Sequence, residues 1–230
     1  VPINQFRGMQ LPVSTFEPYQ TGEVPLGSSA FEKRGIAIDV PVWNNETCIQ
    51  CGNCSYVCPH ACIRPVVLTK DELDNAPEGI KYANTMQLDG LYYSMAITVL
   101  DCTGCGSCAN VCPVNNAGKK DPALVMMPLE ERLDDQPKYD YLVTLAEKQE
   151  VLDKFKASTV KGSQFRMPYL EFSGACAGCG ETPYAKLVTQ LFGDRMYIAN
   201  ATGCSSIWGG SSPSTPYTVN SDGHGPAWAN

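Results

Sequence analysis

A cysteine pattern that occurs twice constrains this chain of 230 residues more than any other feature. Residues 48–59 read C-x2-C-x2-C-x3-C-P, and residues 102–113 repeat that spacing residue for residue. This spacing is typical of two 4Fe–4S clusters in which the fourth cysteine of each run ligates the other cluster. The sequence therefore predicts two clusters held by a crossed set of thiolates.

The crossing fixes which sulfurs are expected to share a cluster. One cluster takes Cys48, Cys51, Cys54 and Cys112, and the other takes Cys102, Cys105, Cys108 and Cys58. Two-residue gaps let the chain wrap one cluster closely, and glycines within the runs (Gly52, Gly104 and Gly106) keep these turns free of Cβ clashes. The three-residue gap is about one helical turn, so that the fourth sulfur points away from its own loop.

Other uses of cysteine fit this pattern less well. Disulfide-dense chains are usually short and secreted. Zinc sites use paired C-x2-C knuckles, without a third cysteine and a Cys-Pro in a duplicated run. Iron–sulfur clusters need reducing, usually cytoplasmic, surroundings. Two nearby candidates are not interpreted as ligands: Cys62 is expected to be a small buried side chain, and His60 a packed or solvated loop histidine.

A third set of cysteines lies closer to the end of the chain: Cys176, Cys179 and Cys204. A C-x2-C pair alone is equally compatible with a redox dithiol. Flanking glycines and the additional cysteine favour a third 4Fe–4S cluster. Three thiolates leave one corner of such a cluster open, either for a substrate or for a ligand from outside this segment.

The elements around the third set are predicted to form a β-α-β unit. Residues 169–172 and 196–199 are expected to be strands, and a helix is expected from Thr182, as N-cap, to about Phe192, with Gly193 in a left-handed conformation. All three cysteines would then follow the carboxyl ends of parallel strands, where such sheets bind ligands.

The pattern along the chain predicts an α+β region followed by an α/β region. Residues 1–40, rich in Pro and Gly, are expected to form an extended linker, residues 41–136 a ferredoxin-like domain with two 4Fe–4S clusters, residues 137–164 a connecting helix and loop, and residues 165–230 the start of a further domain. Strands are expected near residues 91–93 and 96–100, and one helix is expected to carry the apolar positions from Leu142 to Phe155, followed by a loop over residues 156–164.

Charge and hydropathy exclude several partners. The formal net charge of −7 argues against a basic nucleic-acid-binding face. No run of about 18 apolar residues predicts a membrane span, and the first residues do not resemble a signal peptide. We therefore expect neither a nucleic acid nor a membrane as partner. Because the chain starts at Val1 and stops at Asn230 without a closing element, we expect it to be part of something larger.

Several stretches resemble pyruvate:ferredoxin (flavodoxin) oxidoreductase, a thiamine-diphosphate iron–sulfur enzyme. They span nearly the whole chain: residues 11–14, the sequence Phe31-Glu32-Lys33-Arg34-Gly35, residues 48–60, 63–65, 174–184 and 225–230. The resemblance implies an internal segment of a longer polypeptide. It would hold a ferredoxin-like two-cluster module followed by the start of an α/β thiamine-diphosphate-binding domain.

The resemblance also implies roles for individual residues. Cys176, Cys179 and Cys204 would ligate the proximal 4Fe–4S cluster, completed by a cysteine beyond Asn230, and Glu181 and Cys204 would line the thiamine diphosphate. That cofactor and its Mg²⁺ would be bound mostly outside the segment, which would contain no catalytic residue and no complete active site.

The implied reaction is the oxidative decarboxylation of pyruvate with coenzyme A to acetyl-CoA and CO₂, with electrons passing through the clusters to ferredoxin or flavodoxin. A homodimer is implied, in the cytoplasm or in an organelle such as a hydrogenosome. The alternative is a stand-alone ferredoxin-type electron-transfer subunit of another redox complex, which the duplicated run alone would favour because such modules are widely reused.

Overall fold

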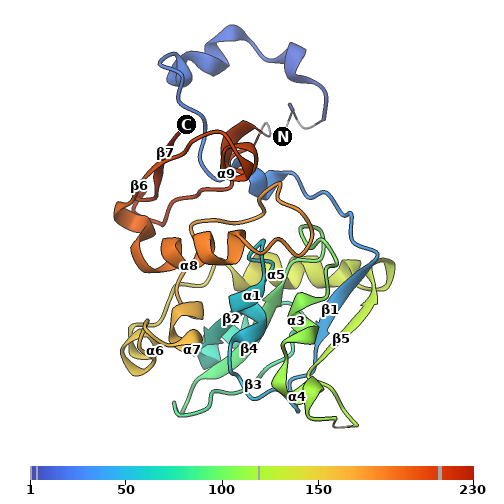
Figure 1. Ribbon diagram of the computed structural model, residues 1–230. Helices are drawn as coiled ribbons and strands as arrows, with labels where there is room; N and C mark the ends of the chain where they lie inside the picture. Colours follow the sequence, from blue (N-terminus) through green and yellow to red (C-terminus); the bar gives the residue numbers. More distant parts are fainter. Residues whose placement is uncertain (1, 4, 119, 212–213) are drawn as a thin grey trace.

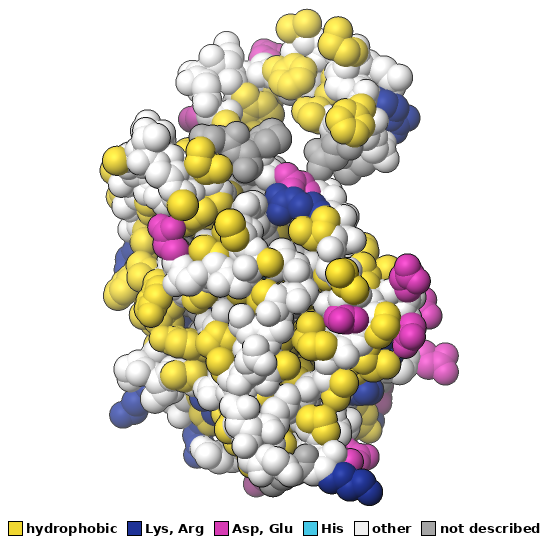
Figure 2. Space-filling model, turned by 45° about the vertical axis from the view of Figure 1, so that its right-hand side comes forward, with side chains coloured by type: hydrophobic (Ala, Val, Ile, Leu, Met, Phe, Trp, Pro, Cys, Tyr) yellow, Lys and Arg dark blue, Asp and Glu magenta, His cyan; other side chains and the backbone are white. Residues whose placement is uncertain are grey.

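The computed structural model describes residues 2–3, 5–118, 120–211 and 214–230. Three short 3₁₀ helices lie in the first part of the chain: η1 (Gly8–Gln10), η2 (Val13–Tyr19) and η3 (Ser28–Phe31). The segment that contains η1 and η2 projects from the rest of the molecule (Figure 1). Its apolar side chains are open to solvent, since Phe6 is 98% and Met9 99% exposed, and Figure 2 shows hydrophobic groups over this segment.

Two antiparallel sheets form the region that contains the cysteine runs. The first pairs β1 (Asp39–Trp43) with β5 (Leu124–Pro128), and the second has the order β2 (Ile63–Leu68), β4 (Tyr92–Ile97), β3 (Ala83–Asn84). Trp43 lies opposite Leu124 in the first sheet, and Ile63 lies opposite Ile97 in the second. The first five residues of β2 alternate between buried and half-buried positions, whereas Tyr93–Ala96 of β4 are all buried.

The strand pairing brings the two cysteine runs together. The first run connects β1 to β2, and the second run connects β4 to β5. Because β1 pairs with β5 and β2 pairs with β4, each sheet joins a strand next to the first run to a strand next to the second. Three short helices belong to the runs: α1 (Asn53–Val57), α3 (Ser107–Asn110) and α4 (Pro113–Asn116). Helix α1 packs against α3. Five of the eight cysteines of the runs belong to or pack against the same core as Trp43, Ile63 and Tyr93, which are all at least 95% buried.

Two predictions about this region are wrong. The apolar stretches at 91–93 and 96–100 contribute to one strand, β4, instead of two. The single helix expected from Leu142 to Phe155 is two helices, α5 (Gln136–Leu142) and α6 (Gln149–Lys154). Leu142 packs in a core with Tyr139 and Phe172, whereas Phe155 packs in the core of the cysteine runs. The apolar stripe therefore serves two cores, and the chain bends between them.

The remaining short elements of this region lie around the sheets. They are α2 (Lys70–Asp74), η4 (Leu129–Glu131), η5 (Leu133–Asp135) and α7 (Val160–Gln164). Helix α7 falls where a loop was expected, because Thr159 caps it by accepting a hydrogen bond from the backbone N–H of Gly162 at 3.1 Å. Thr69 and Glu72 form a capping box at the start of α2.

The last part of the chain contains α8 (Thr182–Phe192), η6 (Gly193–Arg195), β6 (Tyr197–Ala199), α9 (Cys204–Ser206), the π-helix η7 (Ile207–Ser211) and β7 (Ala227–Ala229). Strand β6 pairs in parallel with β7. Residues 169–172 contribute only an isolated bridge between Leu170 and Tyr217. The prediction of a β-α-β unit is therefore wrong. The prediction that the chain stops without a closing element is also wrong, because residues 227–229 form β7.

The helix predicted over residues 182–192 is confirmed as α8, but its N-cap residue and the conformation of the glycine that follows it differ from the prediction. Glu181, and not Thr182, is the N-cap residue. Gly193 has φ −58°, a right-handed conformation that continues into η6. A Cβ at Gly193 would come within 2.5 Å of the Tyr169 ring, so glycine is required there for close packing. Among the described residues, no helix has the length and apolar character needed to cross a membrane.

Candidate metal centres

Two cavities lie between the cysteine runs, and each is lined by four of their sulfur-bearing residues. Cavity A, of about 350 Å³ including its opening to solvent, is lined by Cys48, Cys51, Cys54 and Cys112. Cavity B, of about 370 Å³ measured in the same way, is lined by Cys58, Cys102, Cys105 and Cys108. Each cavity thus takes three cysteines from one run and the last cysteine from the other. These are the two sets that the crossed assignment requires.

The donor chemistry and arrangement fit a bulky inorganic cluster better than a single ion. Four thiols surround a space in each cavity, and 4Fe–4S clusters are held by four cysteine thiolates. In the part of the chain that the structure describes, no group of three or more His, Cys, Asp or Glu side chains is arranged around a single ion. Zinc sites need such convergence, with sulfurs about 2.3 Å from one metal.

Equivalent turns in the two runs place backbone N–H groups on sulfur. The N–H of Gln50 lies 3.4 Å from the Cys48 Sγ, and the N–H of Gly104 lies 3.4 Å from the Cys102 Sγ. Both turn residues have positive φ, 54° at Gln50 and 69° at Gly104. Such N–H donors lower the electron density on cluster sulfur and help to set its potential.

The same turn is stabilised differently in each run. Gln50 is 2% exposed, and its amide donates to the carbonyl of Asn84 at 2.8 Å and accepts from the N–H of Met86 at 2.9 Å. These contacts hold a left-handed backbone that a side chain disfavours. In the second run no side chain fits, because a Cβ at Gly104 would lie 2.9 Å from the carbonyl oxygen of Asp39.

Burial makes four of the eight thiols poor acids in the absence of metal, those of Cys48, Cys54, Cys102 and Cys108. It raises the pKa of Cys102 and of Cys108 to about 12, and it also raises the pKa of Cys54. Thiolates at these positions therefore require the positive charge of bound iron, whose binding would release their protons.

The pKa of Cys58 shifts in the opposite direction. A hydrogen bond from the Cys62 side chain, and secondarily the positive charge of Lys186, hold the pKa of the Cys58 thiol well below its usual range despite burial. The backbone N–H of Cys62 also lies 3.3 Å from the Cys58 Sγ. Cys62 is 3% exposed, as expected for a small buried side chain, and it lines cavity B.

Lys186 is a charged residue that sequence reasoning missed. It lies on α8, is 1% exposed, and its Nζ donates to the backbone carbonyls of Ser55, Tyr56 and Cys58. Burial lowers the pKa of Lys186 to about 8. The buried positions of α8 also include Thr182 and Thr189. The helical spacing of these polar residues with Lys186 was the sequence signal that could have indicated a buried lysine.

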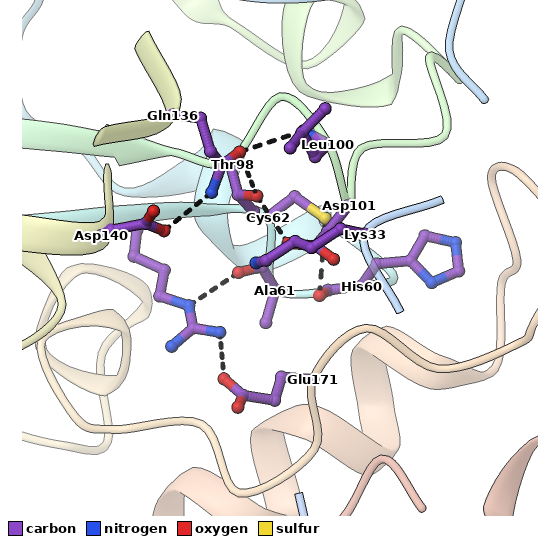
Figure 3. A network of polar contacts seen from close by, with 11 residues as sticks. Lys33, His60, Ala61, Cys62, Thr98, Leu100, Asp101, Gln136, Asp140 and Glu171 are labelled. Carbon is purple, nitrogen blue, oxygen red and sulfur yellow. Dashed lines mark hydrogen bonds and ion pairs between the residues drawn. The ribbon is translucent and has the colours of Figure 1, made fainter. Parts of the chain in front are cut away.

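A polar network lies behind cavity B (Figure 3). Lys33 Nζ pairs with the Oδ2 of Asp101 at 2.5 Å, and the Thr98 hydroxyl donates to the same carboxylate at 2.6 Å. The backbone N–H of Leu100 donates to the Gln136 side chain at 3.1 Å. This network anchors the residue that precedes Cys102 to the segment that contains Glu32-Lys33-Arg34.

His60 is packed, and it lines cavity B next to Cys58. Its side chain is 2% exposed, with Nδ1 3.4 Å from the Ser173 hydroxyl, and burial lowers its pKa. Its backbone carbonyl accepts from the N–H of Phe172 at 3.0 Å. The residue therefore links the first run to the loop that leads to the third cysteine set.

The turn that contains Cys176 and Cys179 lies on the surface beside cavity B. Cys176 and Cys204 are exposed and Cys179 is half-buried, and the backbone of Cys179 closes a turn onto the Cys176 carbonyl at 3.1 Å. A Cβ added at Gly178 would lie 3.6 Å from the Cys105 Cβ. The structure therefore places the Cys176–Cys179 turn against cavity B.

Glu181 is exposed at the start of α8. Burial, with a smaller contribution from the charge of Glu181, raises the pKa of Tyr217 to about 12. The charge of Glu181 therefore acts on Tyr217, which packs with Trp208 in the core of the C-terminal region.

The strand pairing and the two thiol-lined cavities are those of a dicluster ferredoxin-type domain. Residues 44–116 match a family described as a 4Fe-4S dicluster domain. Residues 1–37, which include Glu32-Lys33-Arg34, match a family described as the EKR domain of unknown function.

Longer proteins are similar to the whole chain. It is 54% identical over its full length to the pyruvate-flavodoxin oxidoreductase of Enterobacter agglomerans. It is 57% identical over 99% of its length to the pyruvate:ferredoxin oxidoreductase of Moorella thermoacetica, and 53% identical over its full length to the pyruvate dehydrogenase (NADP(+)) of Cryptosporidium parvum. The chain spans 19% of the first two proteins and 11% of the third. The predicted resemblance is confirmed.

Proposed function

We propose that this chain is the electron-relay segment of a pyruvate:ferredoxin or pyruvate:flavodoxin oxidoreductase. The observation that supports this most strongly is the pair of cavities with crossed cysteine sets, in a chain similar along its whole length to enzymes of that name. The similarity extends over the region that contains the third cysteine set, which does not favour the alternative of a stand-alone electron-transfer subunit.

In this proposal cavities A and B each hold one 4Fe–4S cluster. Cys48, Cys51, Cys54 and Cys112 ligate the cluster in cavity A, and Cys58, Cys102, Cys105 and Cys108 ligate the cluster in cavity B. Burial of the thiols, the backbone N–H donors and the turns with positive φ fit such clusters. The two clusters supply one-electron storage in a protein interior.

We propose that a third 4Fe–4S cluster is held by Cys176, Cys179 and Cys204, with its fourth cysteine outside these 230 residues. Because the Cys176–Cys179 turn lies against Cys105, electrons would pass from the third set to cavity B and then to cavity A. Ile49, 45% exposed and lining cavity A, marks the surface where ferredoxin or flavodoxin would accept them.

Residues 165–230 would begin the thiamine-diphosphate-binding domain, with Glu181 and Cys204 beside the cofactor. Thiamine diphosphate with Mg²⁺, bound mostly outside this segment, would supply the electron sink for decarboxylation. Overall, pyruvate and coenzyme A would yield acetyl-CoA, CO₂, a proton and two electrons, and the clusters held by this chain's cysteines would take up those electrons one at a time. We propose a homodimer in a reducing compartment, the cytoplasm or an organelle such as a hydrogenosome.

The test uses the full-length polypeptide purified without oxygen. We expect pyruvate together with coenzyme A to reduce its clusters and then added ferredoxin, and we expect a Cys58→Ser variant to retain pyruvate binding but to reduce ferredoxin at least tenfold more slowly. Clusters that dithionite reduces but pyruvate with coenzyme A does not would contradict the proposal and favour the stand-alone carrier.

A further inference from the structure

A buried lysine without an acidic partner is uncommon, because burying an unpaired charge is costly. Lys186 is 1% exposed. The ion pairs of the described residues all use other cations, among them Lys33, Arg64 and Lys148. Hydrogen bonds to backbone carbonyls, and not a carboxylate, offset the cost of its burial.

The contacts of Lys186 require the protonated form. Its Nζ faces three acceptors, the carbonyl oxygens of Ser55, Tyr56 and Cys58, the last two at 3.3 and 3.0 Å. An ammonium has three N–H donors and no acceptor, so the three carbonyls use all of its hydrogens. These carbonyls lie at the C-terminal end of helix α1, where the Ser55 carbonyl also accepts from the Cys58 N–H, and the end of a helix favours a cation.

The ammonium lies beside the ligand that crosses between the runs. It contacts the backbone of Cys58, and its charge interacts favourably with the Cys58 thiolate. Cys58 lines cavity B together with Cys102, Cys105 and Cys108. A 4Fe–4S cluster with four thiolates becomes more negative by one charge when it is reduced, and a nearby buried cation stabilises that reduced form.

Cavity A has no equivalent charge among the described residues. The lysine beside it, Lys161, is only half-buried, and its Nζ lies 4.2 Å from the centre of the Phe155 ring. Its charge reaches Cys48 and Cys51, but solvent screens a half-buried cation far more than a buried one. The two cavities therefore differ in electrostatics although their cysteine spacing is the same.

We propose that the ammonium of Lys186 raises the reduction potential of the cluster in cavity B relative to that in cavity A. Helix α8 begins three residues after Cys179, so the helix that follows the third cysteine set inserts this charge beside the adjacent cavity. Cavity B would then be a favourable first acceptor for an electron that leaves the third set. The inference rests on the proposed function, because it assumes that both cavities hold clusters.

The test compares Lys186→Met and Lys186→Gln in the full-length polypeptide, by redox titration monitored with electron paramagnetic resonance. Methionine removes both the charge and the hydrogen bonds, whereas glutamine removes the charge but keeps two N–H donors for the carbonyls. We expect both variants to lower the ratio of reduced to oxidised cluster B about tenfold at a fixed potential, which is a shift of 59 mV for one electron. Cluster A should shift less than twofold.

Lys161→Met is the matched control, and we expect it to change the ratio for cluster B less than twofold. Wild-type potentials in the glutamine variant would overturn the inference, because only the hydrogen bonds would then matter. Equal shifts of both clusters, or loss of cluster B in both variants, would also overturn it. Absence of clusters from the wild-type protein would contradict the proposed function instead.

Discussion

The two cysteine runs have the same spacing but different surroundings. In the first run a glutamine, Gln50, holds the left-handed turn with side-chain hydrogen bonds, whereas in the second run the corresponding residue is Gly104. Cys58, the crossing ligand of cavity B, accepts from the Cys62 N–H at its sulfur and from the Lys186 ammonium at its carbonyl. Spacing therefore determines which sulfurs meet, whereas the residues packed around them determine how readily each site accepts an electron.

The largest expected effect tests the crossing itself. Cys112→Ser lies in the second run but should abolish the cluster of cavity A, since Cys112 lines that cavity with Cys48, Cys51 and Cys54. We expect the variant to lose that cluster's paramagnetic signal almost completely while the cluster of cavity B remains.

Cys62→Ser is the control, because Cys62 lines cavity B without being one of its four proposed ligands. It should retain both clusters. Damage from Cys112→Ser that is confined to cavity B would contradict the crossed assignment.

The next effect separates the two turns of the second run. Gly104→Ala should destabilise the chain by about 2–3 kcal/mol, because it combines a left-handed backbone with a Cβ placed 2.9 Å from the Asp39 carbonyl. Gly106→Ala has the same kind of backbone, at φ 73°, but meets nothing within 4 Å, so about 1–2 kcal/mol is expected. Urea unfolding of the anaerobic protein measures both, and equal losses would show that the close approach to Asp39 is unimportant.

A smaller effect is expected in cavity A. Trp43 is 5% exposed and lines that cavity, and its indole Nε1 has no hydrogen-bond partner within the described residues. The indole also opposes the rise in the pKa of Cys48 that burial causes. Its N–H is thus placed to donate to sulfur, and such donors raise cluster potentials.

Trp43→Phe keeps an aromatic ring beside Tyr93 but removes the N–H. We expect the ratio of reduced to oxidised cluster A to fall about threefold at a fixed potential, with cluster B unchanged. The same titration that is used for Lys186 measures this ratio. An unchanged ratio would mean that the indole contributes packing alone.

The smallest effect should leave both clusters untouched. Contacts with Lys148 and the Thr69 backbone lower the pKa of Glu72 below its usual value despite partial burial. The ionised form therefore stabilises the fold above pH 4.5, and that contribution is lost as the pH falls through the lowered pKa. Glu72→Gln should cost about 0.5–1 kcal/mol at pH 7 and nothing at acid pH, with unchanged cluster spectra.

Local spacing predicted which cysteines line each cavity, and their role as cluster ligands stays a prediction. The glycines at 52, 104 and 106 all have positive φ, as the turns require. The strand pairing that brings the runs together depends on contacts between distant residues, and no periodicity within one run specifies it. The break between α5 and α6 has the same origin, because Leu142 and Phe155 pack into different cores.

The C-terminal region shows where local pattern fails. Residues 169–172 have the composition of a strand but bridge Tyr217 only once, and β6 pairs instead with β7, about thirty residues downstream. Lys186 illustrates the same limit, since a lysine on a helix is usually solvated and only the packing of α8 on α1 makes it buried. The three cysteines Cys176, Cys179 and Cys204 remain predicted ligands.

An iron anomalous-scattering map of crystals of the anaerobically purified protein tests the central claim most directly. We expect a compact group of iron atoms in each cavity, with Cys112 bound to the group that holds Cys48, Cys51 and Cys54, and Cys58 bound to the group that holds Cys102, Cys105 and Cys108. A single metal peak in either cavity, or a cluster ligated entirely by its own run, would contradict it.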